Sequence, residues 1–493
     1  MATEDPKLHV LILPYVTPSH MMPLVEIGRL IAARGVNITI IATPHNANLF
    51  RSSVDQDINS VHQISVHELK FPSAEVGLPE GIENFSAITS TDMSAKVFEG
   101  IMRLRKPMED LIRNLSPDCI FSDMFYPWTV ELAEELKIPR LMFYPSSFFY
   151  HCVSHSLKLY APHDQKVQSD TESFLIPHLP DTIEMKRSQL QDHVKGKSRL
   201  RVFMDAIKDS ELKTYGIVHM TFYELEPAYA DHYIKIKPAK FWGILPLFQF
   251  FKGLKAPRSN DSQHNCLSWL DTQKPNSVVL LSFGSLVRFP DAQLTEIALA
   301  LEASTHSFIW AVRKSEASRE NQEESWLPAG FEERMMEGNK GMMVRGWAPQ
   351  VKILAHPATG AFMTHCGWNS VLEAVAAGVP LITWPLFAEQ FYNEKAINEV
   401  LKIGVGVGAE VWNPTFEITC PPVGRDKIEK ALSKLMGGSE ESQKIRQKAK
   451  EMAAMAEGAV AEGGSSYNNI TALIEELKAC AFEKSKNGYI ICK

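Results

Sequence analysis

Short apolar runs alternate with segments of helical period in the first half of the chain. The run His9–Leu13 ends at a proline, and Pro23–Arg34 then places apolar residues at helical spacing before Gly35. The next segment, Val36–Ala42, has the pattern of a buried strand. A strand, a helix and a second strand form the repeating unit of a parallel sheet, so this pattern predicts an α/β fold.

The same order continues along the first half and then recurs in the second. In the first half we expect strands at Cys119–Ser122 and Arg140–Phe143, with a helix at Trp128–Leu136 between them. In the second half the strand-like runs are Ser277–Phe283, Ser307–Val312, Ala361–Thr364 and Leu381–Trp384. The two series predict two α/β domains.

A segment without regular period separates the two series. Pro246–Gln263 mixes Pro, Gly, Lys, Ser and Asn, which is typical of a linker. We therefore expect an N-terminal domain over residues 1–247, a linker over 248–263 and a C-terminal domain over 264–469, followed by a final segment, 470–493. The length of 493 residues agrees with more than one domain. The polar segment Lys314–Ser325 is expected to be a surface loop without function.

Composition and charge exclude several classes of protein. The chain has 51 basic and 58 acidic residues, a net charge of -7 and no long basic run, so we expect no nucleic acid partner. No apolar stretch approaches the roughly 20 residues of a transmembrane helix. The acidic N-terminus does not fit a secretory signal, and the 7 cysteines lack paired spacing and suit reduced thiols. We expect a cytoplasmic protein with no transmembrane anchor.

Three short patterns suggest cofactor chemistry but lack the context that it needs. The glycines of Gly404–Gly408 are followed by Val411–Pro414 rather than by a helix, which argues against a dinucleotide loop. Gly196–Ser198 ends like a phosphate-binding loop, but Gln191 stands where that loop needs glycine. Asp55–Asp57 spaces two carboxylates like a metal site, and we expect a solvated loop there instead. We therefore expect no bound metal or ATP.

The densest group of polar and aromatic residues follows the expected strand Ala361–Thr364. Apolar residues after His365–Ser370 predict a helix that begins near Gly367. The free N–H groups and partial positive charge of a helix N-terminus suit a diphosphate, and Gly367 lets the backbone approach it.

Helix capping is the simpler alternative for part of this group. Asn369 and Ser370 are both good capping residues, but capping explains neither His365 nor Trp368 nor Glu373. Glu373 lies about one turn into the expected helix, where a carboxylate can accept hydrogen bonds from ribose hydroxyls.

Four segments of this region resemble the signature box of plant UDP-dependent glycosyltransferases. They are Trp347-Ala348-Pro349-Gln350, His365-Cys366-Gly367-Trp368-Asn369-Ser370, Glu373, and Trp384-Pro385-Leu386-Phe387-Ala388-Glu389-Gln390. The interval from Trp347 to Gln390 has 44 residues, which is the span of that box. The resemblance continues at Pro180–Met185, Phe222–Glu226 and Gly463–Asn469, and so covers nearly the whole chain.

The resemblance implies a GT-B type fold, in which two Rossmann-like domains with parallel sheets face each other. The UDP-sugar would lie mainly on the second domain and the acceptor on the first. The segment 470–493 would form a helix that crosses back to the N-terminal domain. The partners implied are a UDP-sugar donor, which is a substrate rather than a cofactor, and a lipophilic small-molecule acceptor. Neither a metal nor a cofactor is implied, and we expect a monomer.

The resemblance also implies a role for each residue of the donor site. Trp347 would stack on uracil, while the Ala348 backbone, Gln350 and Glu373 would hold the base and ribose. The diphosphate would be bound by Ser285, His365, Asn369 and Ser370, beside Gly367. The sugar would be held by Trp368, Glu389 and Gln390. A closing glutamine usually accompanies glucose in this family, so Gln390 favours UDP-glucose.

The family pattern matches a general base at His20 and its carboxylate partner at Asp123. By itself, a histidine before a helix is more often a capping or surface residue, and Asp123 alone fits a loop cap. Each residue follows an expected strand, however, and the carboxyl ends of parallel strands meet at one edge of a sheet. His20 would remove the proton of an acceptor hydroxyl while Asp123 fixes its tautomer, and the family's reaction inverts the anomeric centre to give a β-glycoside. Ser19 departs from the glycine that often precedes this histidine.

The acceptor is the least determined part of the site. Apolar residues expected near His20, among them Met21, Phe125, Phe149 and Phe387, suggest an apolar aglycone, although core packing explains about half of such residues equally well. The chain resembles the branch of the family that glycosylates triterpenoids, steroids and flavonoids, and we favour a triterpenoid or steroid. The alternatives are another UDP-sugar, the extension of a sugar chain, and a non-catalytic carrier of metabolites.

Overall fold

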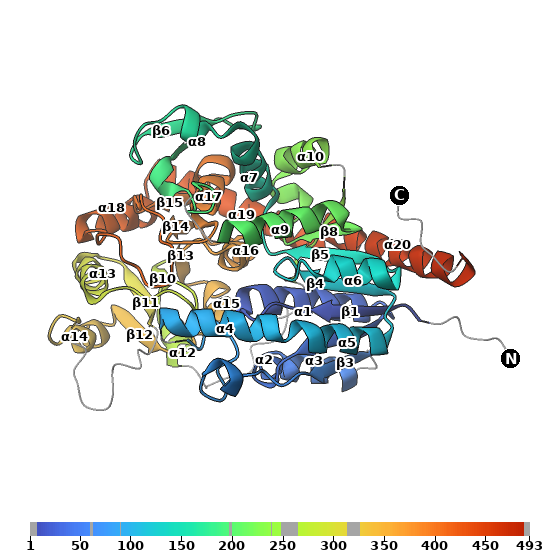
Figure 1. The fold of residues 1–493 in the computed structure, drawn as a ribbon. Helices are drawn as coiled ribbons and strands as arrows, with labels where there is room; N and C mark the ends of the chain where they lie inside the picture. The colour runs from blue at the N-terminus through green and yellow to red at the C-terminus, as the bar shows by residue number, and fades with distance from the viewer. Residues whose placement is uncertain are drawn as a thin grey trace.

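Two parallel sheets, each flanked by helices, form the framework of the protein (Figure 1). The structure is a computed structural model, and it describes residues 7–59, 63–88, 90–196, 200–237, 239–247, 265–312 and 326–487. A short antiparallel hairpin, β6 (Ser173–Ile176) and β7 (Ile183–Lys186), lies outside both sheets.

The first sheet has seven parallel strands in the order β3-β2-β1-β4-β5-β8-β9. The strands are β1 (His9–Leu13), β2 (Asn37–Ala42), β3 (Ile64–Glu68), β4 (Cys119–Asp123), β5 (Arg140–Tyr144), β8 (Gly216–His219) and β9 (Lys240–Gly243). The central strands β4 and β5 are buried at every residue, as expected for a parallel sheet that is covered on both faces.

The second sheet has six parallel strands in the order β12-β11-β10-β13-β14-β15. The strands are β10 (Val278–Ser282), β11 (Ser307–Val312), β12 (Gly341–Arg345), β13 (Thr359–Thr364), β14 (Leu381–Thr383) and β15 (Gly404–Gly406). The strands expected from the sequence are therefore present, with ends that differ by one or two residues. This α/β fold with parallel sheets confirms the predicted fold class.

Helices connect the strands of each sheet. In the first half they are α1 (Pro18–Ala32), α2 (Pro44–Asn48), α3 (Arg51–Asn59), α4 (Thr91–Arg103), α5 (Arg105–Leu115), α6 (Thr129–Leu136), α7 (Phe148–Tyr160), α8 (Pro162–Gln165), α9 (Leu200–Lys213) and α10 (Pro227–Ile236). In the second half they are α12 (Asn265–Leu270), α13 (Asp291–Ala303), α14 (Phe331–Glu337), α15 (Gln350–Leu354), α16 (Trp368–Ala377), α17 (Gln390–Lys395), the π-helical turn η4 (Ala396–Leu401), α18 (Arg425–Met436), α19 (Glu440–Val460) and α20 (Ser465–Asn487).

The strand order of each sheet reverses at its centre and so creates a crevice. In the first sheet the reversal lies between β1 and β4, and in the second it lies between β10 and β13. Connections from the two strands at such a point leave in opposite directions, so ligands bind outside their carboxyl ends. His20 and Asp123 belong to the first crevice, and Ser285 and His365 belong to the second.

The last helix, α20, lies along the first sheet although it follows the second in sequence (Figure 1). Its Ser466 Oγ accepts the Leu245 N–H at 2.9 Å, and Asn469 Nδ2 donates to the Gly243 carbonyl at 2.9 Å. The Tyr215 hydroxyl of the first half donates to Glu476 at 2.8 Å. These contacts join α20 to β9 and to residues next to β8 and β9.

Two local predictions were wrong. The first helix begins at Pro18 rather than at Pro23, because Pro18 is the proline at its N-terminal position and Pro23 lies inside the helix. His20 is therefore in the first turn of α1 and not before it. Asp55–Asp57 is not a solvated loop but part of α3, where Asp57 is paired with Arg29.

Other sequence predictions fall on β15 or outside the described residues. Gly404 begins the strand β15, where a Cβ atom would lie 2.5 Å from Ile397, so close packing explains this glycine. The whole of the predicted linker, 248–263, and the whole of Lys314–Ser325 lie outside the described residues. Among the helices that the structure describes, none has both the length and the hydropathy to span a bilayer.

Candidate active site

His20 and Asp123 form a direct pair at the crevice of the first sheet. His20 Nδ1 lies 2.8 Å from Asp123 Oδ2. Asp123, the last residue of β4, is fully buried, and its Oδ1 accepts the Phe125 N–H at 2.9 Å. A carboxylate that faces Nδ1 favours the tautomer with the proton there, so Nε2 keeps the lone pair. The His20 side chain retains 18% exposure, which leaves this base open to a substrate.

Aromatic rings surround His20. The Phe125 ring stacks on the His20 ring at 5.1 Å between centroids and contacts Tyr15 at 4.6 Å. Phe203 of α9 stacks on Phe125 at 6.1 Å, and Phe98 of α4 meets Phe203 at 5.6 Å. These rings form an apolar wall beside the base. No sequence motif predicts Tyr15, Phe98 and Phe203, because they come from three separate segments.

The row of rings continues to the second half of the molecule. The ring centroid of Phe85 lies 6.0 Å from that of Tyr15 and 6.4 Å from that of Phe416. The centroids of Phe416 and Phe387 are 5.3 Å apart. Phe387 in turn lies 6.3 Å from His365. Aromatic side chains thus line the path between the two histidines.

The predicted acceptor residues divide into two groups. Phe125 and Phe387 belong to the row of rings described above. Met21 and Phe149 are each 1% exposed and belong to hydrophobic cores, where Phe149 packs on Tyr229 at 4.8 Å. For Met21 and Phe149 the structure favours core packing over a place in the acceptor pocket.

The loop between β13 and α16 presents unpaired amides at a helix N-terminus. Gly367 is the N-cap of α16, and no side chain accepts a hydrogen bond at this cap. Asn369 and Ser370 lie inside the first turn, so neither caps the helix. The first N–H groups of α16 therefore remain available to an anion.

His365 is held closely between two glycines of this crevice. A Cβ atom at Gly284 would lie 2.8 Å from His365 Nε2, and one at Gly367 would lie 2.6 Å from it. Burial lowers the pKa of His365 to about 4, so the ring is neutral at pH 7 and acts as a hydrogen-bond donor rather than as a cation. Ser285 follows Gly284 in the loop after β10, at the same end of the sheet.

The residues predicted to bind the base and ribose lie together. Gln350, the first residue of α15, donates from Nε2 to Glu373 Oε2 at 2.7 Å and to Ser370 Oγ at 3.3 Å. Burial raises the pKa of Glu373 to about 7, and the Gln350 amide opposes this shift. Trp347 is 82% exposed before the half-buried Ala348, which leaves an open indole face for stacking.

The predicted sugar-binding residues have different environments. Gln390 Oε1 accepts the N–H groups of Leu386 at 2.9 Å and Phe387 at 3.0 Å, which leaves its Nε2 to donate. Burial raises the pKa of the Glu389 carboxyl, and the nearby His20 imidazole opposes the shift. The Trp368 indole is buried and donates to the Met220 carbonyl at 2.6 Å, so its N–H is already engaged.

Direct hydrogen bonds join the two crevices. Asn369 Nδ2 donates to the carbonyl of Ser19 at 3.0 Å, immediately before His20. The Trp368 bond to Met220 also crosses between the halves. His20 and the loop between β13 and α16 are therefore neighbours. Ser19 makes this contact through its backbone, so its departure from glycine does not alter the bond.

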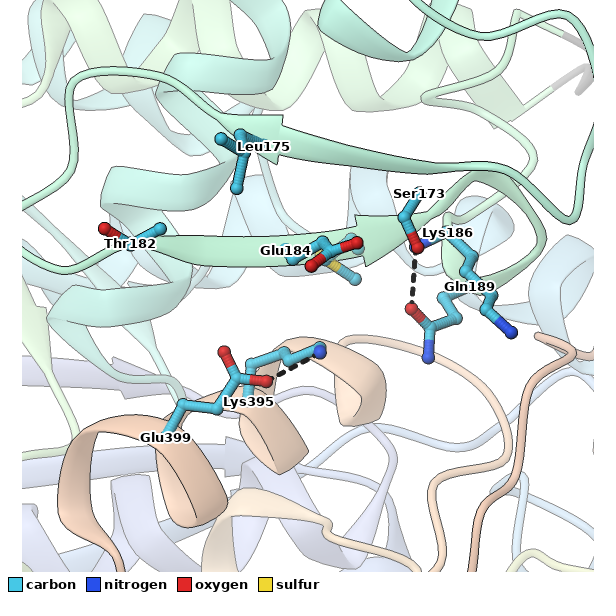
Figure 2. A pocket seen from close by; sticks show the side chains of 9 residues that line it. Ser173, Leu175, Thr182, Glu184, Lys186, Gln189, Lys395 and Glu399 are labelled. Carbon is cyan, nitrogen blue, oxygen red and sulfur yellow. Dashed lines mark hydrogen bonds and ion pairs between the residues drawn. The ribbon is translucent and has the colours of Figure 1, made fainter.

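A separate cavity of about 470 Å³ lies between the hairpin β6–β7 and the end of α17 (Figure 2). Its lining residues are Ser173, Leu175, Thr182, Glu184, Met185, Lys186, Gln189, Lys395 and Glu399. Lys395 and Glu399 form an ion pair at 2.7 Å across one side of it. None of the predicted site residues lines this cavity, so it is distinct from the crevices around His20 and His365.

Comparisons with known proteins agree on one family. The model of the family described as UDP-glucoronosyl and UDP-glucosyl transferase matches residues 19–412. Nuatigenin 3-beta-glucosyltransferase of Solanum aculeatissimum is 52% identical over 96% of this chain and 97% of its own. Solanidine UDP-glucose glucosyltransferase 1 of Solanum tuberosum is 50% identical, with the same coverage of 96% and 97%. UGT73P12 of Glycyrrhiza uralensis, solved with glycyrrhetinic acid 3-O-monoglucuronide, superposes with a TM-score of 0.91 at 41% identity and covers 98% of both chains.

Proposed function

Because the chain belongs to the UDP-glucoronosyl and UDP-glucosyl transferase family, we propose that it transfers glucose from UDP-glucose to a triterpenoid or steroid. The acceptor group is a hydroxyl or carboxyl, and the product is a β-glycoside formed by inversion. One observation carries this proposal. The His20–Asp123 pair, 2.8 Å apart, adjoins the diphosphate loop through the Asn369 bond to Ser19.

The first step is the activation of the acceptor. A hydroxyl group is a weak nucleophile at neutral pH, and it needs a base within hydrogen-bond reach. His20 Nε2 takes the hydroxyl proton as the oxygen attacks the anomeric carbon, while the proton on Nδ1 stays bonded to Asp123. Asp123 stabilises the imidazolium that forms, and it keeps its second oxygen on the Phe125 N–H.

The second step is the departure of UDP. The bond between the anomeric carbon and the diphosphate oxygen breaks, and its electron pair leaves with UDP. The amides at the start of α16 and the neutral His365 ring donate hydrogen bonds to the diphosphate. We propose that these donors stabilise the leaving group without a metal ion. Trp347, Gln350 and Glu373 hold uridine, and Glu389 and Gln390 hold the glucose.

The apolar wall beside His20 supports a lipophilic acceptor. Phe98, Phe125, Phe203 and Tyr15 present ring surfaces to a flat polycyclic molecule, whose burial is favourable in proportion to its apolar area. The relatives named for nuatigenin and solanidine support a steroid or triterpenoid over a flavonoid.

We also propose a cytoplasmic monomer, and the described cysteines are all free, which agrees with reduced thiols.

A second candidate function is the extension of an existing sugar chain. The structural neighbour of Glycyrrhiza uralensis was solved with a glucuronide, a molecule that already carries a sugar. An enzyme of this kind uses the same base and donor site, so only the acceptor distinguishes the two functions.

A mass-spectrometric transfer assay tests the proposal. Purified protein is incubated with UDP-glucose, EDTA and three sets of acceptors, namely triterpenoid or steroid aglycones, their monoglycosides, and flavonoids. A hexose adduct on the aglycones that is absent in His20→Ala supports the proposal, and an adduct on the monoglycosides alone supports chain extension. If calorimetry shows UDP binding and no acceptor gains a hexose, the proposed acceptor class is wrong.

A further inference from the structure

One buried amide on α17 contacts both loops of the donor site. Asn393 is fully buried, and its Nδ2 donates to the Cys366 carbonyl at 2.9 Å and to Glu389 Oε1 at 3.3 Å. Both partner atoms are oxygens that accept hydrogen bonds, so a flipped amide would place Asn393 Oδ1 against the Cys366 carbonyl oxygen and Glu389 Oε1. The two acceptors therefore fix the orientation of this side chain.

The first contact sets the direction of an amide in the diphosphate loop. Cys366 has a φ of 66°, a left-handed conformation that is unusual for a residue with a Cβ atom. The carbonyl of Cys366 and the N–H of Gly367 belong to the same planar trans peptide, so they point in opposite directions. By holding this carbonyl, Asn393 directs the Gly367 N–H away from α17.

The second contact holds the carboxylate that is proposed to bind the sugar. Glu389 is the N-cap of α17, and Asn393 lies one turn further along the same helix. Burial raises the pKa of Glu389, and the hydrogen bond from Asn393 opposes the shift. Asn393 therefore orients this carboxylate as well as favouring its charged form.

Stability alone does not account for this amide. Among the described residues Asn393 Oδ1 has no hydrogen-bond partner, although it is buried. A buried acceptor without a partner costs free energy, which an apolar side chain of similar volume would not. The residue lies beyond the interval Trp347–Gln390, so the resemblance to the signature box assigns it no role.

We propose that Asn393 is a positioning residue that ties the diphosphate loop His365–Gly367 to the sugar-binding carboxylate of Glu389. The two parts of the donor are then held in one geometry, with the anomeric carbon in line with the oxygen that attacks. This inference rests on the proposed function, because it takes UDP-glucose as the donor.

The variant Asn393→Leu removes both hydrogen bonds at similar volume. Asn398→Leu is the matched control, because Asn398 lies on the neighbouring turn η4 and, among the residues that the structure describes, donates only to Thr383 Oγ1, at 3.0 Å. We expect Asn393→Leu to lower kcat roughly 100-fold, since small displacements of reacting groups have effects of that size. It should also remove most of the difference in affinity between UDP-glucose and UDP, and Asn398→Leu should change neither quantity.

A double-mutant cycle with Glu389→Ala separates positioning from general damage. If Asn393 acts through Glu389, Asn393→Leu should lower kcat by a much smaller factor in the Glu389→Ala background than in the wild type. The proposal would be overturned if the double variant lost kcat by the product of the two single factors. It would also be overturned if Asn398→Leu lowered kcat as much as Asn393→Leu. Asn393→Ser serves if the leucine variant does not fold, since it also breaks the link to both loops.

The measurements distinguish this inference from the proposed function. If the wild type binds UDP-glucose but transfers hexose to no acceptor, the acceptor class is wrong, and calorimetry of the variants still decides the role of Asn393. A wild-type chain that binds neither UDP nor UDP-glucose would overturn both.

Discussion

The donor and acceptor sides of the cleft are built differently. In the proposed site the donor side comes mainly from Trp347–Gln390, with Ser285 and Asn393 outside that interval, and it uses backbone amides and polar side chains that are already paired, such as Gln350 with Glu373. The acceptor side has one polar pair, His20 with Asp123, inside a wall of rings from separate segments, including Phe98 and Phe203.

The difference follows from the chemistry of the two ligands. A nucleoside diphosphate needs directed donors at fixed positions, and a compact loop and helix N-terminus supply them. An apolar acceptor is held by burial, which has no direction, so rings from any segment serve. Substitutions should therefore have three kinds of effect. Those at His20 and Asp123 should lower kcat, those on the donor side should lower UDP affinity, and those at the rings should lower acceptor affinity.

The largest effect is expected at Asp123, between the two sides. Both Asp123 oxygens accept hydrogen bonds, one from His20 Nδ1 and one from the Phe125 N–H. An asparagine at this position has only one oxygen, so its side-chain nitrogen must face one of these two donors. Where that nitrogen faces His20, Nδ1 must accept and Nε2 carries the proton. We expect kcat to fall roughly 10³- to 10⁴-fold with the UDP dissociation constant unchanged.

Steady-state kinetics and calorimetry on one preparation check this expectation. The control is Asp118→Asn, since Asp118 Oδ2 accepts the His9 N–H at 2.9 Å and lies before β4, away from the base. A variant Asp123→Asn that kept wild-type kcat would show that the base does not depend on this carboxylate.

The next effect is expected on the donor side, at Trp347. Its indole is 82% exposed, so Trp347→Ala should leave the melting temperature unchanged. Stacking of an aromatic side chain on a base contributes about 1–3 kcal/mol, so we expect UDP affinity to fall roughly 10- to 100-fold. At saturating donor, kcat should stay the same. Calorimetric titration with UDP checks the prediction, and an unchanged affinity would place the uracil elsewhere.

A smaller effect is expected on the acceptor side, at Phe203. Phe203→Ala removes one ring from the wall, and we expect the acceptor KM to rise roughly tenfold while UDP affinity stays constant. The neighbouring Val202 is 79% exposed on the same helix, so Val202→Ala is the matched control. Kinetics with varied acceptor check the prediction. A parallel loss of UDP affinity would show that the two sides are not separable.

The same contrast explains how much the sequence could predict. The parallel strands followed from apolar runs, and the donor residues are a prediction from one continuous resemblance. The acceptor wall could not be predicted, because Tyr15, Phe98 and Phe203 approach only through the order of the strands. Apolar composition alone did not separate Phe125, beside the base, from Phe149, which packs in a core.

Local chemistry also outweighed two sequence signals. Pro23 was interpreted as a helix start, although Pro18 already begins α1 and places His20 within its first turn. Phe222–Glu226 matched the family without a role, and the structure gives one to Glu226. Its carboxyl accepts the N–H groups of Phe148 at 3.0 Å and Phe149 at 2.7 Å, at the start of α7. Such a contact joins residues far apart in sequence, so no local pattern predicts it.

The smallest expected effect is a pH dependence of donor affinity at Glu373. Burial raises the pKa of Glu373 to about 7, so its ionised fraction falls from about nine tenths at pH 8 to about one tenth at pH 6. The carboxylate accepts hydrogen bonds from ribose hydroxyls, and protonation removes one acceptor. We therefore expect UDP-glucose to bind roughly three- to fivefold more weakly at pH 6 than at pH 8.

The choice of ligand and control excludes the phosphates, His365 and Glu394 as the source of this pH dependence. Both phosphates of UDP-glucose are esterified, and the pKa of His365 is lowered to about 4, so neither titrates between pH 6 and pH 8. Burial also raises the pKa of Glu394 to about 7, but Glu394 accepts from Thr383 Oγ1 at 2.8 Å and has no proposed contact with the donor. Burial also raises the pKa of Glu389, which is proposed to hold the glucose, so Glu373→Gln should remove the ribose part of the pH dependence in calorimetry, and Glu394→Gln should retain all of it.

The sign of the effect separates binding from folding. A carboxyl whose pKa rises from 4.5 to about 7 on folding holds its proton longer in the folded state, so the unliganded fold loses stability as the pH rises through that window. Donor affinity should rise over the upper part of the same window. An affinity that fell with rising pH would follow the stability instead, and it would remove Glu373 from the ribose site.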